Sequence, residues 1–212
     1  MPVSGPKGLG EYMRSLYLAR GAQERWPEAD IRFIISRQAP YAGDVPFRSH
    51  LTDSSPTKHV QEVNRIVDDF GPDVTVFDGS GRSSQMKHAR SAGSATIFLS
   101  QHARKRRRGF KLARMRSTDL HWIVQPQFVD GDLNGVEKMK LRLVGRPKVT
   151  FIGPVFAPPR APDRPLPAEP YFFCCAGGGG NRVQGRNSAE WFREAAAEVS
   201  RKSGMPGVMV MG

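Results

Sequence analysis

Two glycine-rich stretches contain the residues of this 212-residue chain that are best suited to holding a phosphate group. Glycines let the backbone approach a ligand closely, and a loop that opens a helix offers its free N–H groups to an anion. Near the start, Gly8 and Gly10 have the spacing G-x-x-G-x-G, which differs from the dinucleotide pattern G-x-G-x-x-G and fits a tight turn equally well. Between a predicted strand and a predicted helix, a run of four glycines predicts a diphosphate-binding loop: Gly177, Gly178, Gly179 and Gly180.

A P-loop is a competing interpretation of the second glycine stretch. Residues 180–187 nearly fit the pattern G-x-x-x-x-G-K-[ST]. However, Arg186 takes the place of the lysine, and Asn187 takes the place of the magnesium-binding hydroxyl. A P-loop NTPase is therefore not favoured.

Two polar residues follow predicted strands and are candidates to line a ligand crevice. Asp78 comes directly after the strand 74–77, and His102 follows the strand 95–100. In doubly wound sheets ligands lie beyond the carboxyl ends of the strands, which is where both side chains are expected. Asp78 also begins a glycine-serine turn, and ordinary turn chemistry explains an aspartate there equally well.

A basic segment accounts for most of the charge of the chain. Eight basic residues lie between Arg104 and Arg116 with no acid among them, and without them the net charge falls from +12 to +4. If the segment is helical, one face carries Arg104, Arg107, Arg108, Lys111 and Arg114. That face predicts binding to an anionic membrane surface or to a phosphorylated ligand, unless the segment is merely solvated. Nucleic acid is a less favoured partner, because Phe110 is the segment's single aromatic residue.

Several classes of protein are not favoured by the composition. The two cysteines, Cys174 and Cys175, are adjacent, and the five histidines show no ligand spacing with them, so neither a disulfide framework nor a metal site is expected. The apolar runs are far shorter than the roughly 20 residues of a membrane helix. Without a charged-then-apolar leader we expect a cytoplasmic location, at the inner face of the membrane if the basic segment binds there.

Short apolar strands alternate with helical patterns through the first part of the chain. Helices are predicted over 12–25, 55–70 and 83–92, and strands over 31–35, 74–77, 95–99, 120–124 and 149–152. This alternation is typical of a parallel sheet with helices on both faces. We therefore predict one doubly wound, Rossmann-like α/β domain over residues 1–156. Its first strand is expected to be missing, because only four residues, one of them proline, precede the glycine turn.

A proline-rich linker and a second, incomplete domain follow. Residues 157–170 are predicted to form the linker, because seven of the chain's 17 prolines lie between Pro154 and Pro170. Residues 171–212 then contain a strand, the glycine loop, a helix from Ser188 and a final strand. A single β-α-β unit is too small to fold alone, so this second domain is expected to be the start of a larger one.

Four segments, in order along the chain, resemble GT-B glycosyltransferases, especially relatives of the lipid-linked N-acetylglucosaminyltransferase of peptidoglycan synthesis. Residues 8–14, Gly-Leu-Gly-Glu-Tyr-Met-Arg, resemble the family's G-L-G-H-x-x-R opening. Residues 72–78 are similar to its "P-D-V-V-V-x-D" strand, and residues 151–155 to the end of its N-terminal domain. The four-glycine loop resembles the opening of its C-terminal domain.

The resemblance implies two Rossmann-like domains, of which the first binds the acceptor and the second a nucleotide-sugar such as a UDP-sugar. It implies no cofactor and no metal, because backbone amides and helix dipoles stabilise the leaving diphosphate. Glu11 stands where the family has histidine and is the candidate catalytic base, although an unperturbed glutamate is a weak base at neutral pH. Alternatively, Glu11 has no catalytic role, and its negative charge simply stabilises the N-terminus of a helix.

We therefore expect a glycosyltransferase that transfers a sugar from a nucleotide-sugar to an acceptor hydroxyl, incomplete in this chain. A lipid-linked or phosphorylated acceptor fits the basic segment. The alternatives are a non-catalytic remnant, a subunit that needs a partner chain to complete the donor domain, or a binder of an anionic surface or nucleic acid through residues 104–116.

Overall fold

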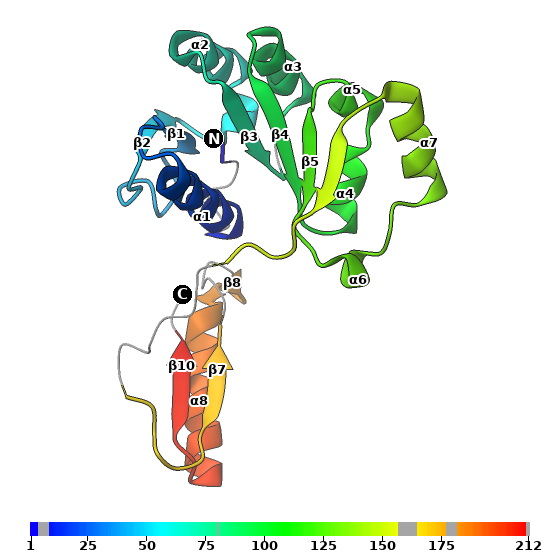
Figure 1. The fold of residues 1–212 in the computed structure, drawn as a ribbon. Helices are drawn as coiled ribbons and strands as arrows, with labels where there is room; N and C mark the ends of the chain where they lie inside the picture. The colour runs from blue at the N-terminus through cyan, green and yellow to red at the C-terminus, as the bar shows by residue number, and fades with distance from the viewer. Residues whose placement is uncertain (4–8, 80, 157–164, 177–181, 211–212) are drawn as a thin grey trace. The chain divides into compact units, whose positions relative to one another are not determined.

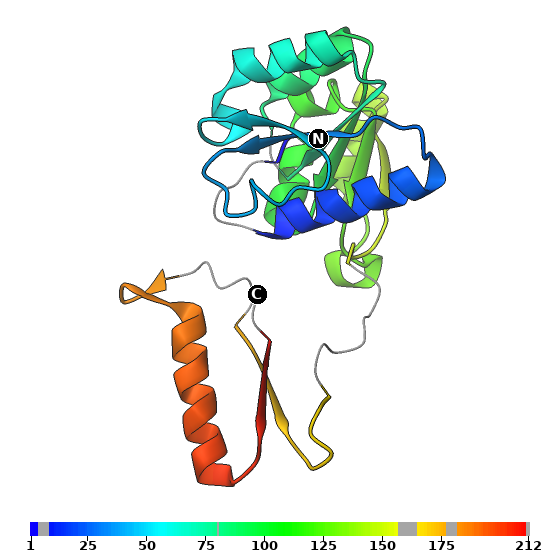
Figure 2. The same cartoon turned by 90° about the vertical axis from the view of Figure 1, so that its left-hand side faces the viewer.

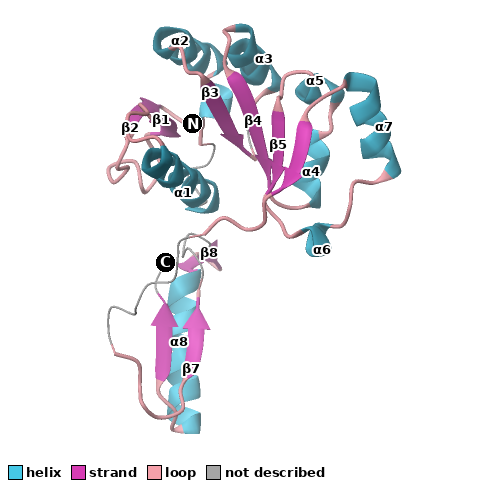
Figure 3. Ribbon diagram, in the orientation of Figure 1, coloured by secondary structure: helices cyan, strands magenta, loops and turns pink. Residues whose placement is uncertain are grey.

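The computed structural model of the chain describes residues 1–3, 9–79, 81–156, 165–176 and 182–210 (Figure 1). The chain divides into two compact units; among the described residues the first includes 10–156, and the second includes 165–176 and 182–210. Both units combine strands with helices (Figure 3).

The strands of the first unit are all parallel. Two of them pair with each other, β1 (Arg32–Ser36) and β2 (Arg48–Thr52). The other four form a sheet in the order β3 (Val74–Asp78), β4 (Ala95–Ser100), β5 (Leu120–Ile123) and β6 (Lys148–Phe151). The predicted strands at these positions are therefore confirmed, whereas β2 was not predicted.

Helices connect these parallel strands. They are α1 (Leu9–Arg25), the 3₁₀ helix η1 (Pro56–Lys58), α2 (Val60–Phe70), α3 (Ser83–Ser91), α4 (Ala103–Gly109), α5 (Leu112–Met115), α6 (Gln127–Asp130) and α7 (Gly135–Val144). Helices α1 and α2 lie on opposite sides of the β1–β2 pair (Figures 1 and 2). The first unit is thus a doubly wound, Rossmann-like α/β structure, as predicted.

The ends of two helices differ from the sequence prediction. The helix expected over 55–70 is interrupted at His59, where the backbone leaves the helical region and η1 ends before α2 begins. Helix α2 ends at Gly71, whose φ of 59° is the left-handed conformation that favours glycine. Helix α7 was not predicted, although Asn134 and Glu137 form a capping box at its start.

Residues 1–3 are not assigned as a strand, but they make one isolated bridge with β1. The backbone N–H of Val3 donates to the carbonyl of Ile34 over 2.9 Å, and the N–H of Ile34 donates to the carbonyl of Met1 over 3.1 Å. Pro2 therefore forms a parallel bridge with Ile34 of β1. A proline at the second position is compatible with this ladder because the bonds are made by its neighbours.

The core of the first unit lies around β3 and β4. Phe77 and Phe98 are almost fully buried and pack with residues of the two helices that follow β2 and β3. These are Val67 of α2 and Met86 and Ala89 of α3. This close-packed cluster holds β3 and β4 against α2 and α3.

The second unit is a single β-α-β unit with a small hairpin. Strands β7 (Phe172–Cys175) and β10 (Gly207–Val210) are parallel, and α8 (Ser188–Ser203) lies between them in sequence. Strands β8 (Arg182–Val183) and β9 (Arg186–Asn187) form an antiparallel pair before the helix. The predicted strand, helix and strand are all found, and α8 extends beyond its expected end at residue 200 to Ser203.

Candidate active site

Asp78 and Arg14 form a buried ion pair at the carboxyl end of β3. Arg14 lies on α1, and its Nε and Nη2 donate to the two carboxylate oxygens of Asp78 over 2.9 and 3.0 Å. The side chains are 9% and 1% exposed. Burial raises the pKa of Asp78 to about 6, although the hydrogen bonds and charge of Arg14 oppose the rise. Asp78 therefore lies at the expected end of the sheet, where it fixes the position of α1.

Glu11 is one turn before Arg14 on the same helix and forms a second ion pair. The Nζ of Lys105, on α4, donates to Oε1 of Glu11 over 3.1 Å and to the carbonyl oxygen of Gly79 over 2.8 Å. Both side chains are about one-fifth exposed, so the pair is open to solvent on one side. This arrangement places the carboxylate of Glu11 beside the turn that follows β3.

The turn after β3 requires glycine at two positions. Gly79 has a φ of 59°, and a Cβ there would lie 3.1 Å from Nζ of Lys105 and 3.2 Å from Oε1 of Glu11. Gly81 has a φ of 91°, and a Cβ there would lie 2.6 Å from the ring of Phe77. A side chain at either position would meet backbone strain; at Gly81 it would also clash with the Phe77 ring, whereas at Gly79 it would displace the ends of the Lys105 and Glu11 side chains.

Two tyrosines lie close to these charges. The rings of Tyr12, on α1, and Tyr41, in the loop after β1, are stacked with centroids 4.0 Å apart. Burial raises the pKa of the Tyr41 hydroxyl to about 12, and the negative charge of Glu11 adds to the rise. Tyr41 therefore stays neutral at physiological pH and is a hydroxyl rather than a base.

A buried arginine and a buried histidine lie beneath the turn. Nη2 of Arg114 donates to the carbonyl of Gly81 over 2.8 Å, and its guanidinium lies 4.7 Å from the centroid of the Phe98 ring. His121, on β5, is fully buried, and its Nε2 lies 2.8 Å from Oγ of Ser100. Burial lowers the pKa of His121 to about 3, helped by the charges of Arg106 and Arg114. His121 is thus a neutral part of the core.

The other residues predicted for the acceptor side are Gly8, Gly10 and His102. Gly10 is in the first turn of α1, and Gly8 falls outside the described residues. His102 is exposed and is the residue that caps α4, the helix that carries Lys105. Its carbonyl accepts from the backbone N–H of Lys105, so His102 supports the helix that reaches Glu11.

The basic segment does not form one helix, which corrects the predicted single face. Helix α4 ends at Gly109, and α5 begins at Leu112. Among the residues expected to share the face, Arg104, Arg107 and Lys111 are exposed, whereas Arg108 is half-buried. Arg114 is buried against Phe98 and does not belong to the surface.

Arg106 is buried as well, and it anchors α4. Its guanidinium donates to both carboxylate oxygens of Glu137 over 3.1 and 2.7 Å and to Oδ2 of Asp130 over 2.9 Å. It also donates to the carbonyls of Asp130, Gly131 and Asp132. The segment therefore mixes buried arginines that hold the fold with exposed ones that face solvent.

The glycine loop of the second unit, Gly177 to Gly180, lies outside the described residues. Residues 182–187, which the competing P-loop interpretation also uses, form the β8–β9 hairpin. Asn187 caps α8, because its side chain accepts from the backbone N–H of Ala189 over 2.9 Å. The side chain of Arg186 forms ion pairs with Glu190 and Glu194 of α8.

Arg14, Lys105 and Tyr41 belong to this cluster but were not predicted from the sequence. Helical spacing could have associated Arg14 with Glu11, because residues three apart share a helix face. Lys105 lies 94 positions from Glu11, and only the fold brings them together. In the described part of the chain no group of three or more metal-ligating side chains is found, and no helix there could span a membrane.

No known family model matches this chain, and no curated protein matches its sequence. Among solved structures it is similar to a UGT transferase from Siraitia grosvenorii, crystallised in complex with UDP, with a TM-score of 0.54. The chain shares its α/β fold with that structure. The alignment has 13% sequence identity and covers 96% of this chain and 60% of that one, so this chain spans about 60% of that structure's length. At such low identity the similarity concerns the fold alone.

Proposed function

We propose that this chain is the acceptor-side part of a GT-B glycosyltransferase that transfers a sugar from a nucleotide-sugar, of the UDP-sugar kind, to an acceptor hydroxyl. The fold supports the class of enzyme. The position of Glu11 is the observation that carries the proposal: its carboxylate is partly open to solvent at the carboxyl end of β3, where ligands of doubly wound sheets lie.

The contacts of the cluster suggest a division of roles. Glu11 is the proposed base that takes the proton of the acceptor hydroxyl. Lys105 holds its carboxylate toward the turn at Gly79. The Arg14–Asp78 pair fixes α1 on the sheet and so positions Glu11 without touching the acceptor. The glycines at 177–180 are proposed to hold the donor diphosphate through backbone amides.

The proposal is tested by measuring UDP release from a panel of UDP-sugars, with and without simple hydroxyl acceptors. Wherever turnover is observed, we expect a loss of at least about a hundredfold in kcat with Glu11→Gln, the usual size of a general-base contribution. Glu24→Gln, an exposed change on the same helix, is the matched control and should keep full activity. Full activity in Glu11→Gln would remove Glu11 from the mechanism.

If no UDP-sugar of the panel releases UDP, the result would instead favour a non-catalytic protein or a subunit that needs a partner chain. Adding a candidate partner then distinguishes these two, because a subunit regains UDP release and a remnant does not. Activity that returns with the partner should still be lost in Glu11→Gln, since the acceptor side is supplied by this chain.

We propose a second function for the exposed arginines and lysine of residues 104–116: attachment to an anionic membrane surface. Arg104, Arg107 and Lys111 are exposed, and none of them forms an ion pair within the described residues. Each basic residue near an anionic surface contributes about 1 kcal/mol of binding. The lipid-linked acceptors of this proposal would lie at such a surface.

Co-sedimentation with vesicles containing phosphatidylserine tests this attachment. The triple change Arg104→Ala, Arg107→Ala and Lys111→Ala should reduce binding strongly and flatten its salt dependence, whereas Arg37→Ala, at an exposed site elsewhere, should not. Binding that is unaffected by the triple change would overturn the proposal. Tighter binding to RNA than to vesicles at the same salt concentration would favour the nucleic-acid alternative.

A further inference from the structure

Three side chains around the start of α2 form a relay of polar contacts from a hydroxyl to a carboxylate. Oγ of Ser54 lies 2.8 Å from Nε2 of His59, and Nδ1 of the same ring lies 3.3 Å from Oε2 of Glu62. A hydroxyl, an imidazole and a carboxylate in this order can serve as a nucleophile, its general base and the group that orients the base. The proposed sugar transfer assigns no role to any of the three.

The backbone determines which nitrogen of His59 carries the proton. The N–H of Ser54 donates to Nε2 of His59 over 3.3 Å, and because a backbone N–H can only donate, Nε2 is an acceptor. The ring proton of neutral His59 is therefore on Nδ1, the nitrogen that faces Glu62. With Nε2 unprotonated, the Ser54 hydroxyl is the donor of the 2.8 Å contact, which is the arrangement that a general base requires.

The turn that carries Ser54 and His59 is held in place by hydrogen bonds from its surroundings. Oγ1 of Thr52, the last residue of β2, donates to the carbonyl of Ser54 over 2.6 Å. Gln85, buried on α3, donates from Nε2 to the carbonyl of Pro56 over 2.8 Å. The N–H of His59 donates to the same carbonyl over 3.2 Å. The hydroxyl and the imidazole are thus held in a fixed mutual geometry, which catalysis by such a pair requires.

The first turn of α2 supplies donors for the negative charge that attack on a carbonyl group develops on its oxygen. The first bond of the helix runs from the N–H of Val63 to the carbonyl of His59. The N–H groups of the three residues between them therefore have no acceptor within the helix. They give the helix end next to the imidazole a partial positive charge, which stabilises an oxyanion.

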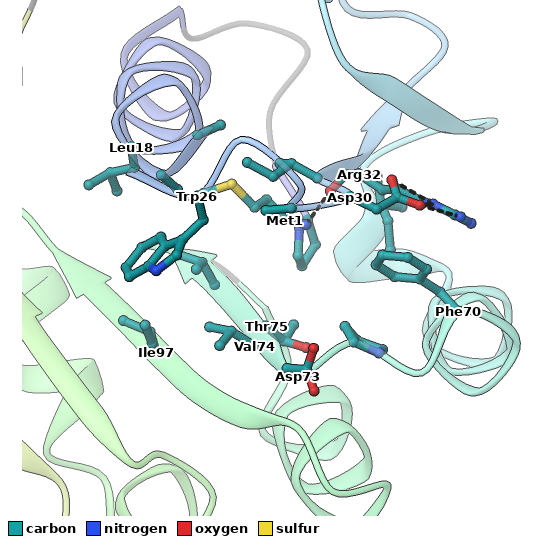
Figure 4. A pocket seen from close by; sticks show the side chains of 18 of the residues that line it. Met1, Leu18, Trp26, Asp30, Arg32, Phe70, Asp73, Val74, Thr75 and Ile97 are labelled. Atoms are coloured by element: carbon teal, nitrogen blue, oxygen red, sulfur yellow. Dashed lines mark hydrogen bonds and ion pairs between the residues drawn. The ribbon is translucent and has the colours of Figure 1, made fainter. Parts of the chain in front are cut away.

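The cluster is open to solvent at the end of β2 where ligands of parallel sheets lie. Ser54 follows the carboxyl end of β2, and the side chains of His59 and Glu62 are partly exposed. The large apolar cavity of the first unit lies elsewhere, beside the amino ends of β1 and β3, where Arg32 and Val74 line it (Figure 4). A substrate of the cluster therefore approaches from the surface, which favours a short, unhindered acyl group.

We propose that Ser54, His59 and Glu62 form a second catalytic site, which hydrolyses short-chain carboxylic esters through an acyl-serine. Nε2 of His59 takes the hydroxyl proton as Oγ of Ser54 bonds to the ester carbonyl carbon, and the ring then gives that proton to the departing alcohol. Water next bonds to the carbonyl carbon of the acyl-serine and gives its proton to Nε2. The carboxylic acid leaves as Oγ of Ser54 takes that proton back. Glu62 is a positioning residue, because it holds Nδ1–H and stabilises the imidazolium without touching the ester.

The test treats the full chain with p-nitrophenyl acetate and, separately, with a fluorophosphonate that labels activated serines covalently. We expect a burst of p-nitrophenol followed by steady turnover, and a fluorophosphonate adduct on Ser54, located by mass spectrometry of peptides. Ser54→Ala should abolish both, and His59→Gln should slow both by at least about a hundredfold. Ser55→Ala is the matched control, because the neighbouring hydroxyl contacts Thr57 instead of the ring, and it should keep both.

Glu62→Gln tests the positioning role. The amide keeps the size of the side chain but does not stabilise the imidazolium, so kcat for the acetate ester should fall by about tenfold or more while KM stays the same. A merely structural role for Glu62 would change the urea midpoint of unfolding and leave kcat of the folded protein unaltered. That result would remove Glu62 from the site.

The native chain alone is sufficient to overturn the proposal, whether or not the variants fold. If its Ser54 takes no fluorophosphonate while circular dichroism shows an intact fold, the Ser54–His59 contact only braces the turn. Ester hydrolysis that persists at the native rate in a folded Ser54→Ala protein would lead to the same conclusion. The outcome does not depend on UDP-sugar turnover and is thus separate from the proposed sugar transfer.

Discussion

At the scale of single residues, the Arg14–Asp78 pair is the most consequential contact near the candidate site. Both side chains are closed to solvent, and two hydrogen bonds join them. A buried pair contributes modestly as a whole, but removing one partner leaves an uncompensated charge. Asp78 therefore depends on Arg14 far more than an exposed carboxylate depends on its partner.

We predict that Arg14→Met lowers the free energy of unfolding by about 3–5 kcal/mol, the range found when one partner of a buried pair is removed. Urea denaturation measures this loss. Arg37→Met is the control, because the Arg37–Asp53 pair is exposed on both sides and its removal should change little. If Arg14→Met and Arg37→Met lowered the free energy of unfolding equally, the Asp78 carboxylate would have to be exposed to water rather than buried.

His121 makes stability depend on pH. Its pKa falls from 6.5 to about 3 on folding, so the unfolded chain binds the proton more tightly, and stability is lost as the pH falls below about 6.5. Asp78 acts in the opposite direction. Its pKa rises from 3.8 to about 6, so its contribution decreases as the pH rises from about 4 to 6. The two effects overlap, and a single variant is needed to separate them.

We predict that His121→Gln loses less stability on acidification than the native chain does. Between about pH 7 and about pH 5 the difference should reach about 2 kcal/mol, because the pKa of the unfolded histidine is crossed in that interval. Urea midpoints measured at several pH values test this. His102→Gln, at an exposed position, should follow the native curve, and parallel curves for His121→Gln would show that His121 is not buried as a neutral group.

At the scale of elements, the basic segment contributes to the stability of the fold as well as to the charge of the surface. Arg106 lies inside it and is 6% exposed, and its guanidinium holds α4 against α6 and the start of α7. The neighbouring Arg107 is exposed. Two adjacent residues of the same type therefore have different roles.

We predict that Arg106→Met destabilises the chain by about 3–5 kcal/mol, because the carboxylates of Glu137 and Asp130 lose their buried partner. Arg107→Met should leave the free energy of unfolding unchanged and reduce retention on an anionic vesicle or heparin surface. Thermal and urea unfolding of the two variants measure the contrast. If Arg107→Met proved the more destabilising change, the assignment of anchor and surface would be reversed.

Most strands of both units could be predicted because their apolar runs are bounded by glycine and proline, as around β3 and β4. Strand β2 could not, because its sequence is Arg-Ser-His-Leu-Thr and its one large apolar residue, Leu51, is 37% exposed. Helix α7 was missed for a similar reason: Val136, Met139 and Leu143 are exposed, so no buried stripe is present. Its capping box was the available signal.

Less of the candidate site than of the fold could be predicted from the sequence. Asp78 could be placed at a strand end from its position after an apolar run. Its partner Arg14 lies 64 residues away, and the fold alone brings the two together. Arg106 could not be singled out within the basic segment, because charge patterns do not reveal which residue of a run is buried.

At the scale of the whole molecule, burial is unequal between the two units. In the described part of the chain every fully buried apolar side chain lies at or before Val124. In the second unit Phe173 and Val210 of the strands and Trp191, Phe192 and Val199 of α8 are all more than one-third exposed. Elements that bury little apolar surface open with little free energy, so the second unit should be much less stable than the first.

We therefore predict that amides of β7, α8 and β10 exchange with deuterium orders of magnitude faster than those of β3, β4 and β5. Hydrogen exchange followed by mass spectrometry measures this, with β4 as the protected reference because its side chains are nearly all buried. The capping bond of Asn187 and the ion pairs of Arg186 stabilise α8 locally but do not replace a core. Protection of α8 equal to that of β4 would mean that another surface covers the apolar face of the second unit. If a partner chain completes the donor domain, adding it should slow exchange in β7, α8 and β10 while leaving β4 unchanged.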